Sequence, residues 1–413
     1  MTERTERVEP PEQAGAPGRV ETAGRGRAPA AGPDAHPGGG PGAVRARRPK
    51  GRPLLYTAYS QDMALLDTRA KKVWLALLLG AAILLSGLPD DLLVLLAAGY
   101  IAAIGAIGLN IVTGYAGQVS LGHAFFVAIG AYTAAAVSGD PGGRTLGFGI
   151  TSMLVWLPAA GAVAALAGVL VAPLAARLRG LYLAIVTLGL VFLGEHVFKE
   201  WDHLTGGPGV GRPAATPELF GFRFDADSAL GTRAQSLYML MLVLLVVFAV
   251  AARNLARSRI GRAFSAVRDR DIAAEVIGVP LTRYKTLAFA ISSFYAGCAG
   301  ALMYTITGFF DPGSFNLLMS VQFIAMVLIG GVATVSGSIA GALFITLLPR
   351  LTQELPALLP FVSADTTQTP NVFQIQVALY GLLIVLFLVF EPRGLFGIWI
   401  RVRAYWKSWP FSY

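Results

Sequence analysis

Long apolar runs dominate this sequence, and each can cross a lipid bilayer as a helix of about 20 residues, or fewer where flanking side chains reach the interface. Hydrophobic residues make up 55% of the chain and charged residues only 14%, about half the share in a typical globular protein. The sequence therefore predicts an all-α polytopic membrane protein of about ten transmembrane helices. The predicted spans are 73–88, 92–112, 122–138, 152–173, 181–199, 237–252, 287–308, 318–335, 338–359 and 373–390.

The charges between these runs predict the topology. Loop 253–286 carries eight basic and three acidic residues, whereas loop 200–236 carries three basic and five acidic residues. Because positive loops stay in the cytoplasm, the first loop is expected inside and the second outside. Ten crossings with both termini cytoplasmic satisfy this rule, and nine or eleven would not. This topology explains the net charge of +9. The lipid bilayer is therefore an expected partner, and nucleic acid is not.

Three regions are expected along the chain. Residues 1–70 are predicted to be a disordered cytoplasmic extension rich in Pro, Gly and Arg, because 1–53 hold nine Pro and ten Gly with almost no large apolar side chains. Residues 71–400 form the transmembrane domain, with a cytoplasmic loop at 253–286. Residues 401–413 form a cytoplasmic tail. The extension lacks the apolar core of a signal peptide, so span 73–88 is expected to remain uncleaved.

A polar, glycine-rich stretch interrupts the apolar sequence between the second and third predicted spans. Gly114 and Gly117 disfavour a continuous helix, and Gln118, Ser120 and His123 follow at once. One interpretation is a hydrated cytoplasmic hairpin that joins two spans. The other is a broken or re-entrant segment at membrane depth, where irregular backbone must be buried in protein or line a water-filled cavity. On that interpretation the polar side chains mark a substrate path.

A weaker copy of this stretch occurs at 330–337, which reads GGVATVSG. It contains Gly330, Gly331 and Ser336, and it matches Gly114–Ser120 at three of seven positions. Transporters often contain internal repeats with interrupted helices in corresponding places. The second stretch is therefore a candidate partner of the first.

A short helix is predicted inside the basic loop. Asp271 can cap a helix that contains Ala273, Ala274 and Glu275, and Gly278 followed by Pro280 would end it. Ile272, Val276 and the alanine pair would form an apolar stripe. Such a loop can be a solvated or lipid-binding face. The defined ends and the stripe favour docking to another protein.

Motifs for catalysis are absent from the sequence. None of the six lysines follows a glycine, so there is no G-x-x-x-x-G-K-[ST] phosphate loop, and no Ser/His/Asp or H-E-x-x-H pattern occurs. No metal site and no cofactor are expected. The single cysteine, Cys298, allows no intrachain disulfide. The chain is thus predicted not to be an enzyme, and any ATP that drives it must be bound by another chain.

Five segments together resemble, in order, the permeases of branched-chain amino acid ABC transporters, and most closely the M-type subunit of the permease pair. The resemblance extends over roughly 85% of the chain and spares the N-terminal extension. The segments are GLNIVTGYAGQVSLGHAFFVAIGAY (108–132), LYLAIVTLGLVFLGEHVF followed by LTGGPGVG (181–211), SRIGRAFSAVRDRDIAAEVIGVPLTRYKTLAFAISSFYAGCAGALM (258–303), VLIGGVATVSGSIAGALF (327–344), and EPRGLFGIW with the terminal PFSY.

This resemblance implies a permease in the bacterial plasma (inner) membrane that works with a second (H-type) permease subunit, two cytoplasmic ATP-binding subunits and an external solute-binding protein. It also implies that the helix from Asp271 to Gly278 couples to an ATPase. Residues of the two interrupted stretches would line the translocation path. They are Gly114, Gly117, Gln118, Ser120, His123, Gly330, Gly331 and Ser336.

The cargo stays open at this point. The family that the sequence resembles also handles urea and short amides, and Glu195 is the nearest acidic candidate for a substrate ammonium group. A stand-alone secondary transporter is the other alternative. Such a protein is expected to carry ionisable residues in the middle of its spans, and these spans have almost none.

Overall fold

The structure, a computed structural model, describes residues 80, 83–178, 180–224, 227, 231–353 and 371–408. These residues all belong to one of the two units of the chain, Thr57–Tyr413. The predicted extension 1–70, most of the predicted span 73–88 and the last residues of the predicted tail lie outside the described residues.

Helices make up about three quarters of the described part. The long helices are α3 (Asp90–Asn110), α4 (His123–Ser138), α5 (Met153–Arg177), α6 (Leu181–Glu200), α8 (Arg233–Arg257), α11 (Leu281–Met303), α12 (Leu317–Gly330), α13 (Val335–Gln353) and α15 (Val372–Phe390). Shorter helices are η1 (Leu85–Gly87), the π-helical turn η2 (Ile111–Tyr115), α7 (Asp202–Thr205), α9 (Arg259–Asp269), α10 (Asp271–Val276), η3 (Pro312–Ser314) and α16 (Gly394–Ser408). Two antiparallel pairs join β1 (Arg212–Pro213) to β4 (Phe309–Phe310) and β2 (Glu218–Leu219) to β3 (Phe222–Arg223).

The positions of the predicted spans agree with these helices. Within the described residues, eight helical stretches are long and apolar enough to cross a membrane: α5, α6, α8, α11, α13 and α15, α3 together with η2, and η3 together with α12. Helix α4 coincides with the predicted span 122–138 but has only 16 residues. The all-α polytopic prediction is therefore confirmed. The exact number of crossings and the cytoplasmic position of both termini stay predictions.

The predicted ends of three spans are wrong. The span predicted at 318–335 ends at Gly330, because the next residue, Gly331, has a positive φ of 125° that no helix accommodates. The following helix therefore begins at Val335 and not at residue 338. The span predicted at 287–308 is the helix α11, which begins six residues earlier and ends at Met303.

Helix α11 lies at the centre of the bundle, packed against α3, α4 and α5. Glycines make this packing close. A Cβ on Gly130 of α4 would lie 2.0 Å from the carbonyl oxygen of Gly297 on α11, and a Cβ on Gly300 would lie 2.0 Å from the carbonyl oxygen of Val127. Small residues at such crossings allow helices to pack backbone against backbone in a membrane. Gly297 also faces α5, where its Cβ would meet Ala164.

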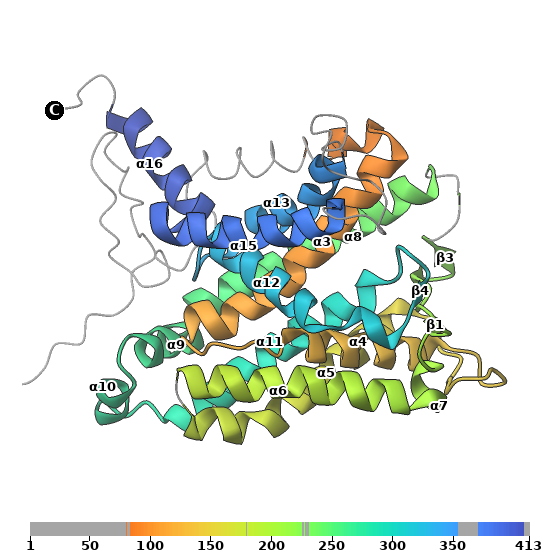
Figure 1. The fold of residues 1–413 in the computed structure, drawn as a ribbon, viewed down its shortest axis with the longest axis horizontal. Helices are drawn as coiled ribbons and strands as arrows, with labels where there is room; N and C mark the ends of the chain where they lie inside the picture. The colour runs from red at the N-terminus through yellow and green to blue at the C-terminus, as the bar shows by residue number, and fades with distance from the viewer. Residues whose placement is uncertain are drawn as a thin grey trace, which may run out of the picture. The chain divides into compact units, whose positions relative to one another are not determined.

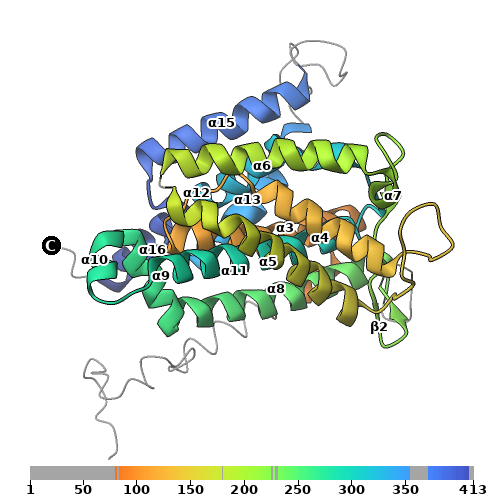
Figure 2. The same ribbon diagram turned by 90° about the horizontal axis from the view of Figure 1, so that it is seen from below.

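The two ends of the helix bundle differ in structure and charge. Figure 1 shows α9, α10 and α16 at one end, and α7 with β1, β3 and β4 at the other, and Figure 2 shows the same separation. The first end contains the basic loop 253–286, which the sequence predicts to be cytoplasmic. The second contains most of the acidic loop 200–236. The two loops of opposite charge thus lie at opposite ends of the bundle.

A buried arginine stabilises the end that carries the strands. Arg212 is 2% exposed, and its guanidinium donates to the carbonyl oxygens of Leu204 at 2.6 Å, Ala135 at 2.6 Å and Leu146 at 3.1 Å. A buried charge needs such partners, because desolvation is otherwise very unfavourable. The side chain therefore fixes the positions of α4, α7 and the loop after α4.

Candidate functional site

The first glycine-rich stretch is an irregular segment between two helices. Helix α3 continues into the π-helical turn η2, and residues 116–122 then have no helical structure before α4 begins. The backbone N–H of Gln118 donates to the carbonyl oxygen of Val112 at 2.9 Å, which folds the chain back on the helix end. Gly117 has a φ of 69°, and a Cβ there would lie 2.7 Å from Cγ of Arg268. Both the backbone conformation and the space require glycine at this position.

The second stretch is a tight turn between α12 and α13, and it packs on the first. Asn110, at the end of α3, connects them. Its Nδ2 donates to the carbonyl oxygen of Thr334 at 3.0 Å and to Oγ of Ser338 at 2.7 Å, and its Oδ1 accepts from the N–H of Ala333 at 2.8 Å. A Cβ on Gly114 would lie 1.9 Å from that Oδ1 and 2.5 Å from the nitrogen of Ala333. The two interrupted stretches therefore meet at a single buried amide.

Asn110 also holds a strained backbone. Ala333 has a φ of 59°, a left-handed conformation that costs an alanine about 1 kcal/mol. Its N–H is the group that donates to Oδ1 of Asn110. Strain of this kind persists only where surrounding contacts fix it, and it occurs often at functional sites.

Ser120 lies within the break, and His123 begins α4, whose first turn contacts α12. Both are buried. The N–H of Ala124, in the first turn of α4, donates to Oγ of Ser320 at 3.0 Å, so another helix satisfies this helix end. The His123 ring stands edge-on to Phe323 with 4.8 Å between the ring centres, and its Nε2 has no hydrogen-bond partner in the described part of the chain. His123 is therefore packed as a buried aromatic ring.

The predicted path residues thus do not form a single cluster. The contact around Asn110 includes or borders Gly114, Gly330 and Gly331. A second location, next to α9, contains Gly117 and Gln118. Ser336 is exposed and lies outside the Asn110 network, in which Ser338 takes part instead. The sequence reasoning missed Asn110, although an amide in the apolar run 92–112 is a visible signal of a buried polar contact.

Helix α10 ends as the sequence predicts. Gly278 has a φ of 90° and follows the last helical turn. Its N–H donates to the carbonyl oxygen of Glu275 at 2.9 Å, and the N–H of Val279 donates to that of Ala274 at 2.9 Å. This pair of bonds is a Schellman motif, which satisfies the last carbonyl groups of a helix.

The start and the faces of α10 differ from the prediction. Arg270, in extended backbone, is the residue that precedes the helix, and Asp271 lies in the first turn without capping it. Asp271 Oδ1 accepts from the N–H of Ile272 at 2.9 Å. The two alanines that the sequence places on one apolar stripe lie on different faces. Ala274 is 2% exposed and packs inward, whereas Ala273 is exposed. The exposed apolar side chains on and beside α10 are Ile272, Val276 and Ile277.

The basic loop contacts the irregular segment directly. Nη1 of Arg268, on α9, donates to the carbonyl oxygen of Gly114 at 3.3 Å, and the Cα of the same residue would lie 3.0 Å from a Cβ on Gly117. Helix α9 also packs against α8, α10 and η2. Any displacement of the α9–α10 region therefore acts on the break after α3 without an intervening linker.

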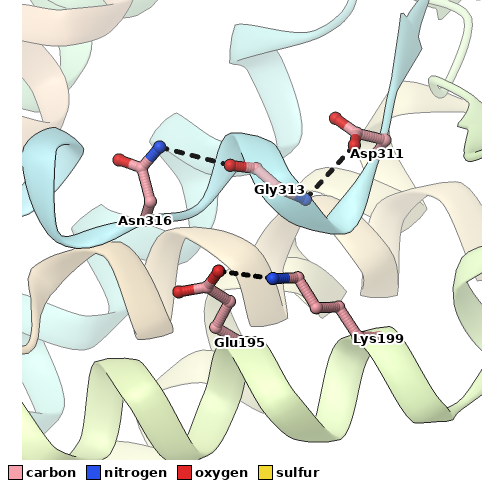
Figure 3. Close-up of polar contacts among 5 residues, drawn as sticks. All are labelled: Glu195, Lys199, Asp311, Gly313 and Asn316. Carbon is pink, nitrogen blue, oxygen red and sulfur yellow. Dashed lines mark hydrogen bonds and ion pairs between the residues drawn. The ribbon is translucent and has the colours of Figure 1, made fainter. Parts of the chain in front are cut away.

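Glu195 lies near the C-terminal end of α6, and its carboxylate forms a salt bridge. Nζ of Lys199 is 2.7 Å from Oε1 of Glu195, one helical turn away. Figure 3 shows these side chains pointing toward the turn that holds Asp311, Gly313 and Asn316. Asp311 accepts from the N–H of Gly313, and Asn316 donates to its carbonyl oxygen. Within the described residues, no group of three His, Cys, Asp or Glu side chains could hold a metal ion.

Replacing Asn110 by leucine is expected to lower the free energy of unfolding by about 2–4 kcal/mol. The change removes the three hydrogen bonds that the Asn110 amide makes, each worth about 1 kcal/mol, and it leaves the N–H of Ala333 without its acceptor. Thermal unfolding of the purified protein in detergent measures the effect. Asn316→Leu is the matched control, since it removes a helix cap worth about 1 kcal/mol and one hydrogen bond to Gly313, but no contact between the two stretches. Equal stability of the two variants would contradict the role given to Asn110.

Comparisons with known proteins agree with the features described above. Residues 92–401 match the family of permease components of branched-chain amino acid transport systems. The chain is similar to the high-affinity branched-chain amino acid transport system permease protein LivM of Salmonella typhimurium and of Escherichia coli, each 34% identical over 307 residues, which are 70% of this chain and 66% of the relative.

A more distant similarity connects the chain to the autoinducer 2 import system permease protein LsrC of an Enterobacter species. The two are 32% identical over 192 residues, which are 45% of this chain and 52% of that protein. The aligned part of this chain spans just under two thirds of the length of the LivM relatives. No solved structure matches the chain.

Proposed function

Because this chain belongs to the family of branched-chain amino acid transport permeases, we propose that it is the M-type permease subunit of an ABC importer in the bacterial plasma membrane. With a second, H-type permease it forms the translocation path for branched-chain amino acids. Two cytoplasmic ATP-binding subunits drive the cycle, and an external solute-binding protein delivers the cargo. The chain crosses the membrane about ten times with both termini in the cytoplasm.

The meeting of the two interrupted stretches at Asn110 is the observation that carries this proposal. Discontinuous helices at corresponding places form the substrate path in many transporters. Here the break after α3 packs on the break between α12 and α13, and a polar side chain that is 1% exposed joins them. The path therefore includes Gly114, Gly117 and Gln118, with Gly330 and Gly331 on the opposite side.

The coupling surface is the exposed face of α10. ATP-driven closure of the ATPase subunits moves this helix, and the contact of Arg268 with Gly114 transmits the movement to the path. Such coupling requires that the partners contact the two states of the permease differently. The residues that form or position this surface are Asp271, Ala273, Glu275 and Gly278. Ala274 is buried and packs the helix against the rest of the protein.

The composition of the assembled transporter tests the proposal. The tagged protein is solubilised gently from its native membrane, and co-purifying chains are identified by mass spectrometry. A second permease and a Walker-motif ATPase in fixed ratio are the expected result. The solute-binding protein is then titrated with leucine, isoleucine, valine and urea to identify the cargo. Recovery of this chain alone, active for uptake into liposomes without ATP, would instead establish a secondary transporter.

Replacing Gln118 by leucine is expected to reduce uptake about tenfold or more without destabilising the protein. The Gln118 amide is 5% exposed, and neither its Oε1 nor its Nε2 has a hydrogen-bond partner in the described part of the chain. Removing an unsatisfied buried group is neutral or stabilising, so a loss of transport would report function alone. Initial uptake rates and melting temperatures are measured together. Gln376→Leu, on α15, is the control. Unchanged uptake by Gln118→Leu would indicate that 114–123 is a simple hairpin without a role in the path.

A further inference from the structure

A cavity of about 230 Å³ lies where the basic loop meets the irregular segment after α3. Residues from three parts of the chain line it: 116–118 of the irregular segment, Leu178, Gly180 and Leu183 near the start of α6, and 267–271 of the basic loop with Lys285 of α11. Binding pockets of drug-sized ligands are commonly about 300–1,000 Å³, so this cavity suits a smaller metabolite.

The lining combines charges of both signs with an apolar wall. Lys285 is 5% exposed, and its Nζ lies 4.0 Å from Oδ2 of Asp271, an ion-pair distance that is longer than a hydrogen bond. Leu183 and Val267, both buried, supply apolar surface beside them. A buried cation and a neighbouring carboxylate against an apolar wall match an ammonium group, a carboxylate and an aliphatic side chain on one ligand.

Gln118 gives an independent sign that the cavity takes a ligand. Its amide is buried and lines the cavity, yet both of its polar atoms lack hydrogen-bond partners among the described residues. Native proteins rarely leave both ends of a buried amide unsatisfied. An amide can donate to a carboxylate and accept from an ammonium group at the same time.

We infer that this cavity binds a free α-amino acid with an aliphatic side chain from the cytoplasmic side. Lys285 holds the carboxylate, Asp271 holds the ammonium group, and Gln118 bonds to either. Leu183 and Val267 contact the side chain. The orientation toward the cytoplasm and the class of ligand rest on the proposed function, whereas the cavity and its lining do not.

Occupancy of this cavity has a consequence for the transport cycle. Its walls include both the segment proposed to line the path and the loop proposed to contact the ATPase, so a bound ligand joins the two. A ligand that binds one conformational state better than another shifts the equilibrium toward that state. Imported amino acid that accumulates in the cytoplasm is therefore expected to slow further import.

Binding to the full-length protein in lipid nanodiscs tests the inference without partner subunits. L-leucine is the probe, and it is compared with L-leucinamide, which lacks the carboxylate, with 4-methylpentanoate, which lacks the ammonium group, and with inorganic phosphate. Leucine is expected to bind most tightly. Lys285→Gln is expected to weaken leucine binding at least about tenfold, a loss of about 1.4 kcal/mol. Arg283→Gln, two residues away and exposed, is the matched control.

A second variant covers the case in which Lys285→Gln does not fold. Asp271→Asn changes a partly exposed side chain, and it is expected to reduce the preference for leucine over 4-methylpentanoate at least about fivefold, because the ammonium group loses its anion. A retained preference would overturn the assignment. So would absence of leucine binding to the wild type, or tighter binding of phosphate than of leucine, which would indicate a simple anion site.

Uptake by the assembled transporter separates this inference from the proposed function. Proteoliposomes that hold ATP in the lumen are preloaded with leucine, and the ratio of initial uptake rates with and without preloading is measured. The wild type is expected to be slowed, and Lys285→Gln is expected to show a ratio close to one. ATP-driven uptake without any slowing would leave the proposed function intact and contradict the regulation. Leucine binding without ATP-driven uptake would contradict the proposed function only.

Discussion

ATP-driven uptake is expected to fall to background when Ala273 is replaced by aspartate, although the protein remains folded. The Ala273 side chain is exposed on α10, beside Ile272 and Val276, which are 66% and 83% exposed. Docking to an ATPase would bury this apolar surface. A carboxylate placed there becomes a buried charge without a partner, which costs about 3 kcal/mol and weakens docking roughly a hundredfold.

Two further variants separate docking from folding. Ala273→Ser adds a polar atom without charge and is expected to retain most of the uptake. Ala274→Asp places the same carboxylate one residue along, where the native side chain is 2% exposed, and is expected to reduce the yield of folded protein instead. Uptake and the amount of co-purified ATPase are measured for each. Wild-type uptake by a correctly inserted Ala273→Asp protein would show that α10 is not the coupling helix.

Replacing Gly130 by alanine is expected to lower the stability of the protein by about 3 kcal/mol, despite the addition of a single methyl group. The new Cβ would lie 2.0 Å from the carbonyl oxygen of Gly297 and 2.3 Å from its Cα, so α4 and α11 must move apart. Overpacking in a closely packed interior typically costs about 1–3 kcal/mol, and here the obstructing atoms are backbone and cannot change rotamer.

The same chain offers a control for this substitution. Gly189, on α6, lies on an exposed face, and a Cβ added there would have no neighbouring atom within 4 Å. Gly189→Ala is expected to leave the melting temperature in detergent unchanged or slightly raised, since alanine favours a helix over glycine by about 1 kcal/mol. Equal melting temperatures for the two alanine variants would show that α4 and α11 are not in backbone contact.

The sequence was sufficient to place the helices, because apolar runs of membrane length have few alternative structures. Their ends were harder to predict. The span predicted at 318–335 runs through the turn at Gly331, since the apolar side chains of Val332 and Ala333 hide a break that only backbone conformation shows. Hydrophobicity reports burial in the membrane and contains no information on φ.

The sequence predicts the two breaks in the helices but not the contact between them. Glycines and polar residues at 114–118 and 330–337 indicated two breaks, but their meeting depends on Asn110, which is 223 residues from Ala333 in sequence. The local sequence match points to Ser336 as the site residue. The serine that accepts a hydrogen bond from Asn110 is Ser338, two residues further along the helix. Pairings over such distances come from the packing of α3 on α13, which no local pattern encodes.

The glycine crossings constrain how this protein can change shape. Where α4 and α11 touch through the backbone at Gly130 and Gly297, no side chains are available to repack, so these two helices are expected to move as one rigid body. Rotation must then be absorbed elsewhere, at residues whose backbone can turn. Gly117 and Gly331, with φ of 69° and 125°, stand at the two breaks and are the expected hinges. Alternating access in this protein would thus be a swing about two glycines rather than a rearrangement of the helix core.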